Sequence, residues 1–486
     1  MQGLLTLRRA FVVILFGGIF VLAARNITDP DFWWHLRTGQ YIVENRSVPH
    51  ADPFSFTKLG QPWIAHEWLS EVFIYGLYRL AGWGGLIVIF ALLTMAIFLF
   101  LYWRCGGQPY VAGVLVLLGA FACRPTWGVR PQTTSLLLAS ILLWLLERSD
   151  QDRRILWWVV PMTLLWANLH AGYSLGIALL LLWLIGSWLD TKLGKESLDQ
   201  HAAPLRPLMV TLSLAVLVVM ANPNGLRLYS YPIKTLRSSA MQRHIVEWFS
   251  PDFHRGELAP FLVLLLAVLV APALTGLRPS ARQLLVLCVS AFAALQFNRF
   301  IPIFILVVIP VLSEQGRAWL EIHGWHRVLQ PAPGAPFSKA LLNAAGMGVL
   351  AILAYTHVRN VVRSQPIAEA EAFPKAAVQF LAEHGFFAPY FNNYSWGGYM
   401  IWKLPAEKVF VDGRADLYGD DFVEDHFRTY GLIGDWRREL ECWKIRTVVV
   451  PPTAPIANAL STDKLWREVF RDSQATVFTR SFAAHN

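Results

Sequence analysis

Residues 85–103 read GLIVIFALLTMAIFLFLYW and contain no charged side chain. A helix needs about 20 mostly apolar residues to cross the hydrocarbon core of a bilayer, and this stretch has that length. The rest of the chain has a similar character, because 55% of its 486 residues are hydrophobic and only 15% are charged, against roughly a quarter in soluble domains. The sequence therefore predicts an integral membrane protein.

Apolar residues gather in similar blocks on both sides of this stretch. In chain order the predicted spans are 10–26, 85–103, 109–123, 133–147, 155–169, 171–189, 207–221, 259–276, 283–297, 300–313 and 340–358. Some are short or contain proline, such as Pro161, so we expect them to tilt or kink. The predicted fold class is a polytopic α-helical membrane protein with about eleven transmembrane helices.

Basic residues indicate the orientation of these spans. Arg8, Arg9, Arg104 and Arg148 lie at ends that alternate along the chain, and positive charge collects on the cytoplasmic side. This places the N-terminus in the cytoplasm and the C-terminus outside. The net charge of +9 fits the same rule, so no nucleic-acid partner is predicted.

Three non-membrane stretches then lie on the outer face. They are residues 27–84, residues 222–258 and the region 362–486. The predicted organisation is a transmembrane domain, 1–361, which includes the first two stretches as outer loops, and a small C-terminal α/β domain, 362–486.

The C-terminal region alternates helical and β-rich patterns, which is typical of an α/β domain. Helices are predicted at 373–384, 421–430 and 463–470, and strands at 399–402, 409–412, 447–450 and 475–479.

The first outer loop holds the densest polar cluster. Its candidate catalytic residues are Asp31, Asp29, Glu67, His66 and His35. A carboxylate in apolar surroundings can act as a general base near neutral pH, and Asp29, Asp31 and His35 can also hold a divalent metal. In the alternative, structural reading, Asp29-Pro30 stops a helix and the neighbouring tryptophans form an interfacial belt.

Arginines on the predicted outer face form a second set. Arg124, Arg130, Arg299 and Arg243 are candidates for binding a lipid phosphate or pyrophosphate, because guanidinium groups bind phosphate bidentately. The alternative is contact with lipid headgroups.

A third set consists of candidate substrate-binding residues. These are Trp396, Tyr399, Asp412, Arg414, Glu247 and Trp248. The two C-terminal motifs are Trp396-Gly397-Gly398-Tyr399 and Asp412-Gly413-Arg414. Asp412 and Arg414 can bind a polar group of a substrate, or they can pair with each other and brace a turn.

These motifs, together with the order of spans and outer segments, resemble the GT-C superfamily of membrane glycosyltransferases. The superfamily includes protein O-mannosyltransferases, aminoarabinose transferases and oligosaccharyltransferases, and the motifs look like those of a bacterial branch. The resemblance implies a multi-pass protein of the bacterial inner membrane with a polyprenyl-phosphate or pyrophosphate sugar donor and a glycan, lipid or protein acceptor on the periplasmic side. It also implies that Asp29 or Asp31 is the base or a metal ligand. Members with and without a catalytic metal exist, so a metal cofactor stays open.

Two other functions are compatible with a polytopic chain. A lipid or solute transporter is disfavoured because no inverted repeat is visible and few ionisable residues lie within the spans. A non-catalytic membrane scaffold with an outer docking domain is disfavoured by the acidic first loop.

Overall fold

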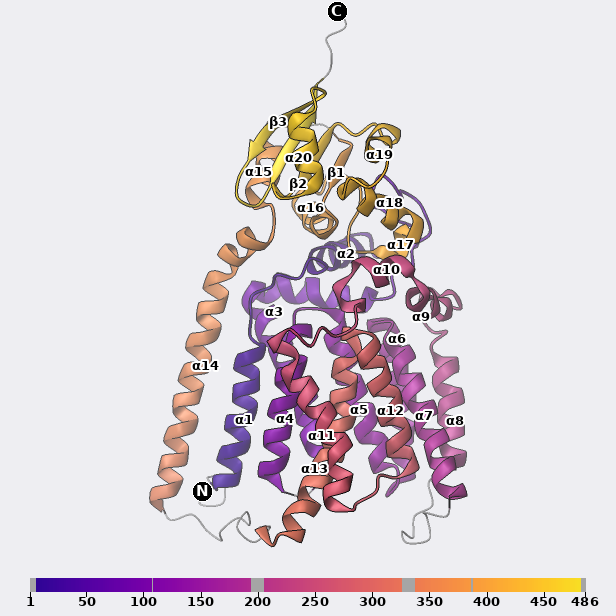
Figure 1. Ribbon diagram of the computed structural model, residues 1–486, viewed down its shortest axis with the longest axis vertical. Coiled ribbons are helices and arrows are strands. Elements are labelled where there is room, and N and C mark those ends of the chain that lie inside the picture. The colour runs from indigo at the N-terminus through magenta and orange to yellow at the C-terminus, as the bar shows by residue number, and fades with distance from the viewer. Residues whose placement is uncertain (1–5, 107, 194–204, 326–336, 386–387, 482–486) are drawn as a thin grey trace, which may run out of the picture. The chain divides into compact units, whose positions relative to one another are not determined.

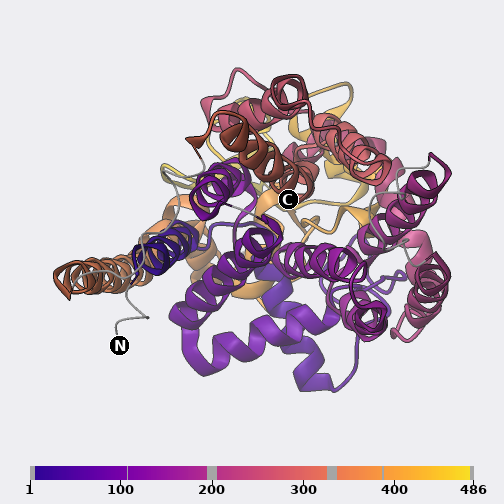
Figure 2. The ribbon, with the colours of Figure 1, turned by 90° about the horizontal axis from the view of Figure 1, so that it is seen from below.

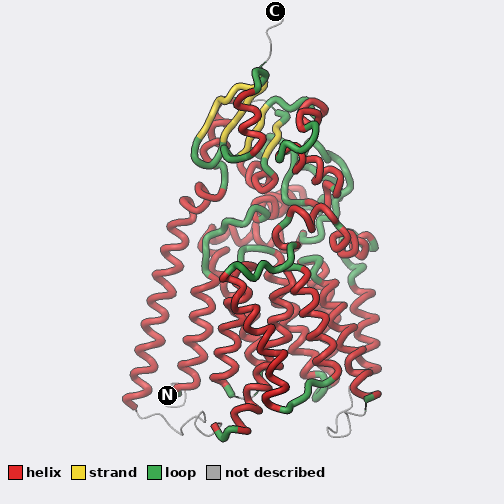
Figure 3. The backbone as a smooth tube through the Cα atoms, viewed as in Figure 1, coloured by secondary structure: helices red, strands yellow, loops and turns green. Residues whose placement is uncertain are grey.

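The computed structural model describes residues 6–106, 108–193, 205–325, 337–385 and 388–481 (Figure 1). Helices dominate, and the strands are confined to the C-terminal region (Figure 3). The chain divides into two compact units. The first unit consists of Met1–Arg25, Ile87–Asn222 and Val246–Val361. The second consists of Asn26–Leu86, Pro223–Ile245 and Val362–Asn486.

Long apolar helices build the first unit. They are α1 (Leu7–Ala23), the second half of α3 (Trp68–Arg104), α4 (Pro109–Cys123), α5 (Pro131–Arg148), α6 (Val159–Leu169), α7 (Tyr173–Lys192), α8 (Leu205–Val218), α11 (Ala259–Thr275), α12 (Ala281–Gln296), α13 (Ile301–Ile322) and the first part of α14 (Phe337–Ala372). Helix α13 is central, since it packs against α4, α11 and α12 and is buried along most of its length. Figure 2 shows several of these helices end on.

Each of the eleven predicted spans overlaps one of these helices. Among the described residues, six helices are long and apolar enough to cross a membrane: Trp68–Arg104, Pro109–Thr126, Tyr173–Lys192, Gly256–Thr275, Asn298–Ile322 and Ala340–Ala372. Two further apolar helices, α8 and α12, are shorter. The structure therefore confirms a membrane-type helical protein, and the count of about eleven crossings stays a prediction.

Shorter elements make up the second unit. Its helices are α2 (Phe32–Asn45), the first half of α3, α9 (Arg227–Arg237), α10 (Ser239–His244), α15 (Lys375–His384), α16 (Gly397–Lys403), α17 (Ala415–Tyr418), α18 (Asp420–Tyr430), α19 (Trp436–Cys442) and α20 (Pro455–Thr462). The end of α14 also belongs to this unit. Helix α3 changes direction at Gly82, whose φ of 58° is readily adopted only by glycine.

A four-stranded sheet forms the core of the C-terminal region. Its strands are β1 (Tyr390–Asn392), β2 (Thr447–Val450), β3 (Trp466–Arg471) and β4 (Thr476–Arg480), in the order β1-β2-β4-β3. Strands β1 and β2 are parallel, and the other two pairings are antiparallel. Every residue of β2 is buried, which suits a strand in the interior of a sheet.

The sequence predicted some of these elements correctly. Strands β2 and β4 and helices α15 and α18 are confirmed. The predicted strand 399–402 is wrong, because these residues belong to α16, which packs against α2. The predicted strand 409–412 makes a single β-bridge, from Val409 to Ser55. The predicted helix 463–470 is wrong as well, since most of it is β3.

Candidate active site

The acidic motif of the first loop forms the start of α2. The carboxylate Oδ1 of Asp29 accepts the backbone N–H of Asp31 at 2.8 Å, which closes a tight turn before the helix. Asp31 is the N-cap residue of α2, and its Oδ1 accepts the indole N–H of Trp34 at 3.2 Å. Both carboxylates are half-buried. Asp31 is therefore oriented by its neighbours while part of it remains accessible.

Glycines from the C-terminal region lie directly against this helix start. A Cβ atom on Gly413 would lie 1.8 Å from Oδ1 of Asp31. A Cβ atom on Gly398 would lie 2.9 Å from the carbonyl oxygen of Pro30. Any side chain at Gly413 would collide with the carboxylate, so glycine permits this approach. The second unit thus brings the runs 396–399 and 412–414 to Asp31.

One turn into α2, His35 meets two glutamates at the start of α3. Its Nδ1 lies 3.2 Å from Oε2 of Glu67 and 3.2 Å from Oε1 of Glu71. All three residues are buried, with exposed fractions of 2%, 4% and 1%. Glu71 was not selected from the sequence. The available signal was its spacing of four residues from Glu67, which places both carboxylates on one face of a helix start.

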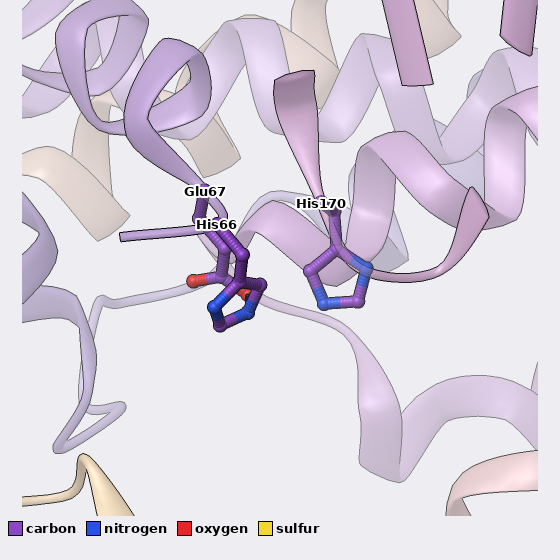
Figure 4. A group of neighbouring side chains, drawn as sticks. All are labelled: His66, Glu67 and His170. Carbon is purple, nitrogen blue, oxygen red and sulfur yellow. Dashed lines mark ion pairs between the residues drawn. The ribbon is translucent and has the colours of Figure 1, made fainter. Parts of the chain in front are cut away.

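His66 is paired with Glu67, as Figure 4 shows for these two neighbouring side chains. Its Nε2 lies 3.1 Å from Oε1 of Glu67, and its Nδ1 lies 3.2 Å from the carbonyl oxygen of Ile64. Both oxygens are acceptors, so both ring nitrogens must carry a proton. Burial alone would lower the pKa of His66, but the charges of Glu67 and Asp416 outweigh it and raise this pKa. The contacts and the raised pKa both favour an imidazolium–carboxylate pair.

Asp412 and Arg414 belong to a buried network of ion pairs. Arg414 donates to Oδ2 of Asp412 at 2.7 Å and to Oδ1 of Asp52 at 2.8 Å. The hydroxyl of Tyr418 donates to Asp412 at 2.7 Å. Burial alone would raise the pKa of Asp52, but the Arg414 charge and the hydrogen bonds from Ser55 and Phe54 hold it below its usual value. This geometry favours the bracing alternative for Asp412 and Arg414.

Trp396 and Tyr399 are core residues of the second unit. Trp396 is 6% exposed and Tyr399 is 1% exposed. The hydroxyl of Tyr399 donates to Glu369 at 2.9 Å, and its ring stacks on Phe373 with the centroids 5.0 Å apart. Both side chains are therefore buried in the packing of α16 against α2 and are not presented to solvent.

In the first unit, four of the predicted site residues lie close together. Arg130 forms an ion pair with Glu247, and the Arg299 guanidinium lies 4.3 Å from the ring centroid of Trp248, a cation–π distance. Burial would raise the pKa of Glu247, but the charges of Arg130 and then Arg299 hold it below its usual value. The predicted phosphate-binding and acceptor-binding residues are therefore neighbours here.

The other two predicted arginines lie elsewhere. Arg124 is exposed, and its carbonyl oxygen accepts a hydrogen bond from Arg25 at 3.0 Å. Arg243 belongs to the second unit, where its side chain lies 3.5 Å from Glu424. Its neighbour His244 lies 2.9 Å from the same carboxylate.

Comparison with known proteins shows which solved structures share this fold. No protein-family model matches the sequence, and no curated protein matches it. The chain is similar in fold to an oligosaccharyltransferase. Two crystal structures of the enzyme from Archaeoglobus fulgidus match. The apo form has a TM-score of 0.53 and 12% identity, over 91% of this chain and 69% of that chain. The form tethered to an acceptor peptide containing an NVT sequon has a TM-score of 0.56 and 11% identity, over 99% and 75%.

At these identities the likeness concerns the fold alone. It shows an oligosaccharyltransferase-like fold, and the GT-C superfamily and its bacterial branch stay predictions. The fold by itself does not carry a reaction, because one fold can host many chemistries.

The predicted metal ligands do not converge on one point. In the part of the chain that the structure describes, neither Asp29 nor Asp31 belongs to a group of three or more His, Cys, Asp or Glu residues close enough to share an ion. His35 belongs to such a group, together with Glu67 and Glu71. His35 is therefore grouped with Glu67 and Glu71 and not with Asp29 and Asp31.

Proposed function

We propose that the protein is a glycosyltransferase that moves a sugar from a polyprenyl-phosphate or pyrophosphate donor to an acceptor on the periplasmic face of the bacterial inner membrane. The observation that carries the proposal is the Asp31 carboxylate, half-buried and packed against the backbone of Gly413. The fold likeness is compatible with the same class of reaction, since both similar structures are of one oligosaccharyltransferase, in one case tethered to an acceptor peptide.

In the proposed reaction Asp31 is the general base. An acceptor hydroxyl attacks the anomeric carbon of the donor sugar, and its proton passes to the carboxylate of Asp31. The bond between the anomeric carbon and the phosphate oxygen breaks, and the electron pair leaves with the polyprenyl phosphate. Asp29 is the positioning residue, because its carboxylate accepts the N–H of Asp31 and shapes the turn. His66 and Glu67 support the site as a charged pair in the same unit.

The leaving phosphate needs positive charge. We assign this role to Arg130 and Arg299, and we keep Arg124 and Arg243 as separate candidates. The charges of Arg130 and Arg299 both lower the pKa of Glu247, so the two guanidinium groups lie near the same carboxylate and could act together on a phosphate. Bidentate guanidinium–phosphate hydrogen bonds would stabilise the leaving group as its charge develops.

Glu247 and Trp248 remain the proposed contacts to the acceptor. Because Trp396, Tyr399, Asp412 and Arg414 are buried, we assign them the positioning of Asp31 rather than direct contact with the acceptor. We also propose the domain division at residue 361, a cytoplasmic N-terminus and a periplasmic C-terminal domain.

The test is mass spectrometry of lipids that copurify with the full-length protein. A polyprenyl phosphate carrying a sugar is expected on the wild type and not on a triple Arg124→Ala, Arg130→Ala, Arg299→Ala variant. Ordinary phospholipids alone on both proteins would count against glycosyl transfer and favour a transporter or a scaffold.

A further inference from the structure

We infer that His35, Glu67 and Glu71 form a binding site for a first-row divalent metal ion such as Zn²⁺ or Mn²⁺. The site is separate from the Asp29–Asp31 turn. It does not depend on the proposed reaction, because metal binding can be measured without sugar transfer.

The first argument is distance. Nδ1 of His35 lies 3.2 Å from one oxygen of each glutamate, and the three ligand atoms all lie within 4.8 Å of one another. Around a tetrahedral ion with metal–ligand bonds of about 2.0–2.1 Å, neighbouring ligand atoms are roughly 3.3 Å apart. The two distances from His35 thus match the spacing around such an ion, and the two carboxylate oxygens lie within 4.8 Å of each other.

The second argument is charge. Glu67 and Glu71 are 4% and 1% exposed, and two buried carboxylates need compensation. Oε2 of Glu71 is buried and, within the described residues, has no hydrogen-bond partner. His66 lies against Glu67 on its other side, and a divalent cation held by all three ligands would place positive charge between the two carboxylates and leave His35 neutral as a ligand.

The third argument is the close packing of α2 against α3. A Cβ atom on Gly39 would lie 2.1 Å from the carbonyl oxygen of Glu71, so α2 and α3 approach as closely as only glycine allows. Gly39 follows His35 by four residues, so this close approach of the two helices lies one turn from the imidazole. The ring of Trp34 also packs on His35, with centroids 3.6 Å apart.

The ligand types select the metal. An imidazole nitrogen with two carboxylates suits Zn²⁺, Mn²⁺ and neighbouring first-row ions better than Mg²⁺ or Ca²⁺, which prefer oxygen ligands throughout. Three protein ligands leave at least one position for water. Because the N–H of His35 donates to the carbonyl oxygen of Asp31 at 3.2 Å, a bound ion would anchor the turn of α2 that carries Asp31.

The experiment uses the full-length protein in detergent, stripped with a chelator and then titrated with ZnCl₂. Bound zinc is measured by elemental mass spectrometry after desalting, and affinity by competition with a chromogenic chelator. The matched control is Glu369→Gln, which removes another buried glutamate of the second unit, one that is paired with Lys403 at 2.8 Å. We expect about one zinc per chain in the wild type and in the control, and at least 100-fold weaker binding in Glu71→Gln, since even the loss of an outer-shell partner costs about 10–100-fold.

Two further measurements use the wild-type protein, so that a misfolded variant cannot explain their results. Co²⁺ added to the stripped wild type is expected to give visible d–d bands, and Zn²⁺ to raise the unfolding temperature of the wild type. Absence of saturable zinc binding by the wild type would overturn the inference. Undiminished binding by Glu71→Gln, or loss of binding in Asp31→Asn with retention in Glu71→Gln, would overturn it as well. Each of these results leaves the lipid-donor test unaffected.

Discussion

The guanidinium of Arg414 lies 2.8 Å from the carboxylate of Asp52, although 362 positions separate the two residues in the chain. Their side chains are 1% and 0% exposed. The same guanidinium also binds Asp412. The C-terminal region and the first predicted outer loop are therefore joined through one buried cation, and the start of α2 is positioned by both.

Arg414→Met is expected to destabilise the second unit strongly. It leaves Asp52 and Asp412 buried without their cation, a change that costs about 3–5 kcal/mol in free energy of unfolding. Thermal unfolding of the full-length protein in detergent measures the loss. The control is Arg437→Met, because Arg437 is 54% exposed in its pair with Asp463, and its replacement should change stability by about 0.5 kcal/mol or less. Similar losses of stability in both variants would contradict a stabilising role for the contacts of Arg414 with Asp52 and Asp412.

Asp31→Asn is expected to abolish transfer while the protein still binds its donor. Removal of a general base typically lowers the rate by about 10²–10⁴-fold, and asparagine keeps an oxygen that can accept the indole N–H of Trp34. A donor lipid that is no longer consumed should accumulate on the purified variant. Lipid mass spectrometry against the wild type checks this, and an unchanged amount of donor together with full transfer activity would rule out Asp31 as the base.

Gly413→Ala is expected to impair the site by displacing Asp31. The new Cβ atom would lie 1.8 Å from Oδ1 of Asp31, and a misplacement of about 1 Å can cost roughly 100-fold in rate. Gly76→Ala is the matched control, since a Cβ atom there meets nothing within 4 Å. Transfer is measured with the donor that copurifies with the wild type. Equal activity of the two variants would show that the close contact is unimportant.

His426→Phe is expected to reduce the acid sensitivity of the protein. His426 in α18 is 0% exposed, lies among aromatic rings such as that of Phe391, and has no hydrogen-bond partner for either ring nitrogen within the described residues. Burial, assisted by the charge of His244, lowers the pKa of His426 from 6.5 to about 3.

The sign of the pH effect follows from proton binding. Between pH 3 and 6.5 the unfolded chain protonates His426 and the folded chain does not, so stability is full above pH 6.5 and falls as the pH is lowered. Unfolding temperatures measured across this range should decline less steeply in His426→Phe than in the wild type. A variant of the exposed His50, His50→Phe, should keep the wild-type slope. Identical slopes in all three proteins would contradict a neutral, buried His426.

Local patterns predicted most of the helices and failed at several strands. The run 399–402, Tyr-Met-Ile-Trp, has the aromatic and branched residues of a strand, yet it is helical in α16 and buries its side chains against α2. Packing against a partner helix overrides a weak local preference in so short a segment. In the same way, the pairing of β3 with β4 converts a predicted helix into a strand.

The candidate site was only partly visible in the sequence. Asp29, Asp31, His66 and Glu67 stand out because polar residues cluster between apolar spans. Glu71 did not stand out, since a single glutamate at the start of an apolar helix is an ordinary capping choice. Its importance comes from His35, which α2 brings to 3.2 Å.

The sequence by itself determined the membrane-type helices and the polar cluster of the first loop, because both depend on residues that are near neighbours in the chain: a continuous apolar run must leave water, and Asp29, Asp31 and His35 lie within seven positions of one another. Only the tertiary structure decided that Arg414 braces Asp52, that Gly413 touches Asp31, and that His35 faces two glutamates. These contacts depend on the close packing of distant segments, in which the position of one backbone relative to another is set by many side chains at once.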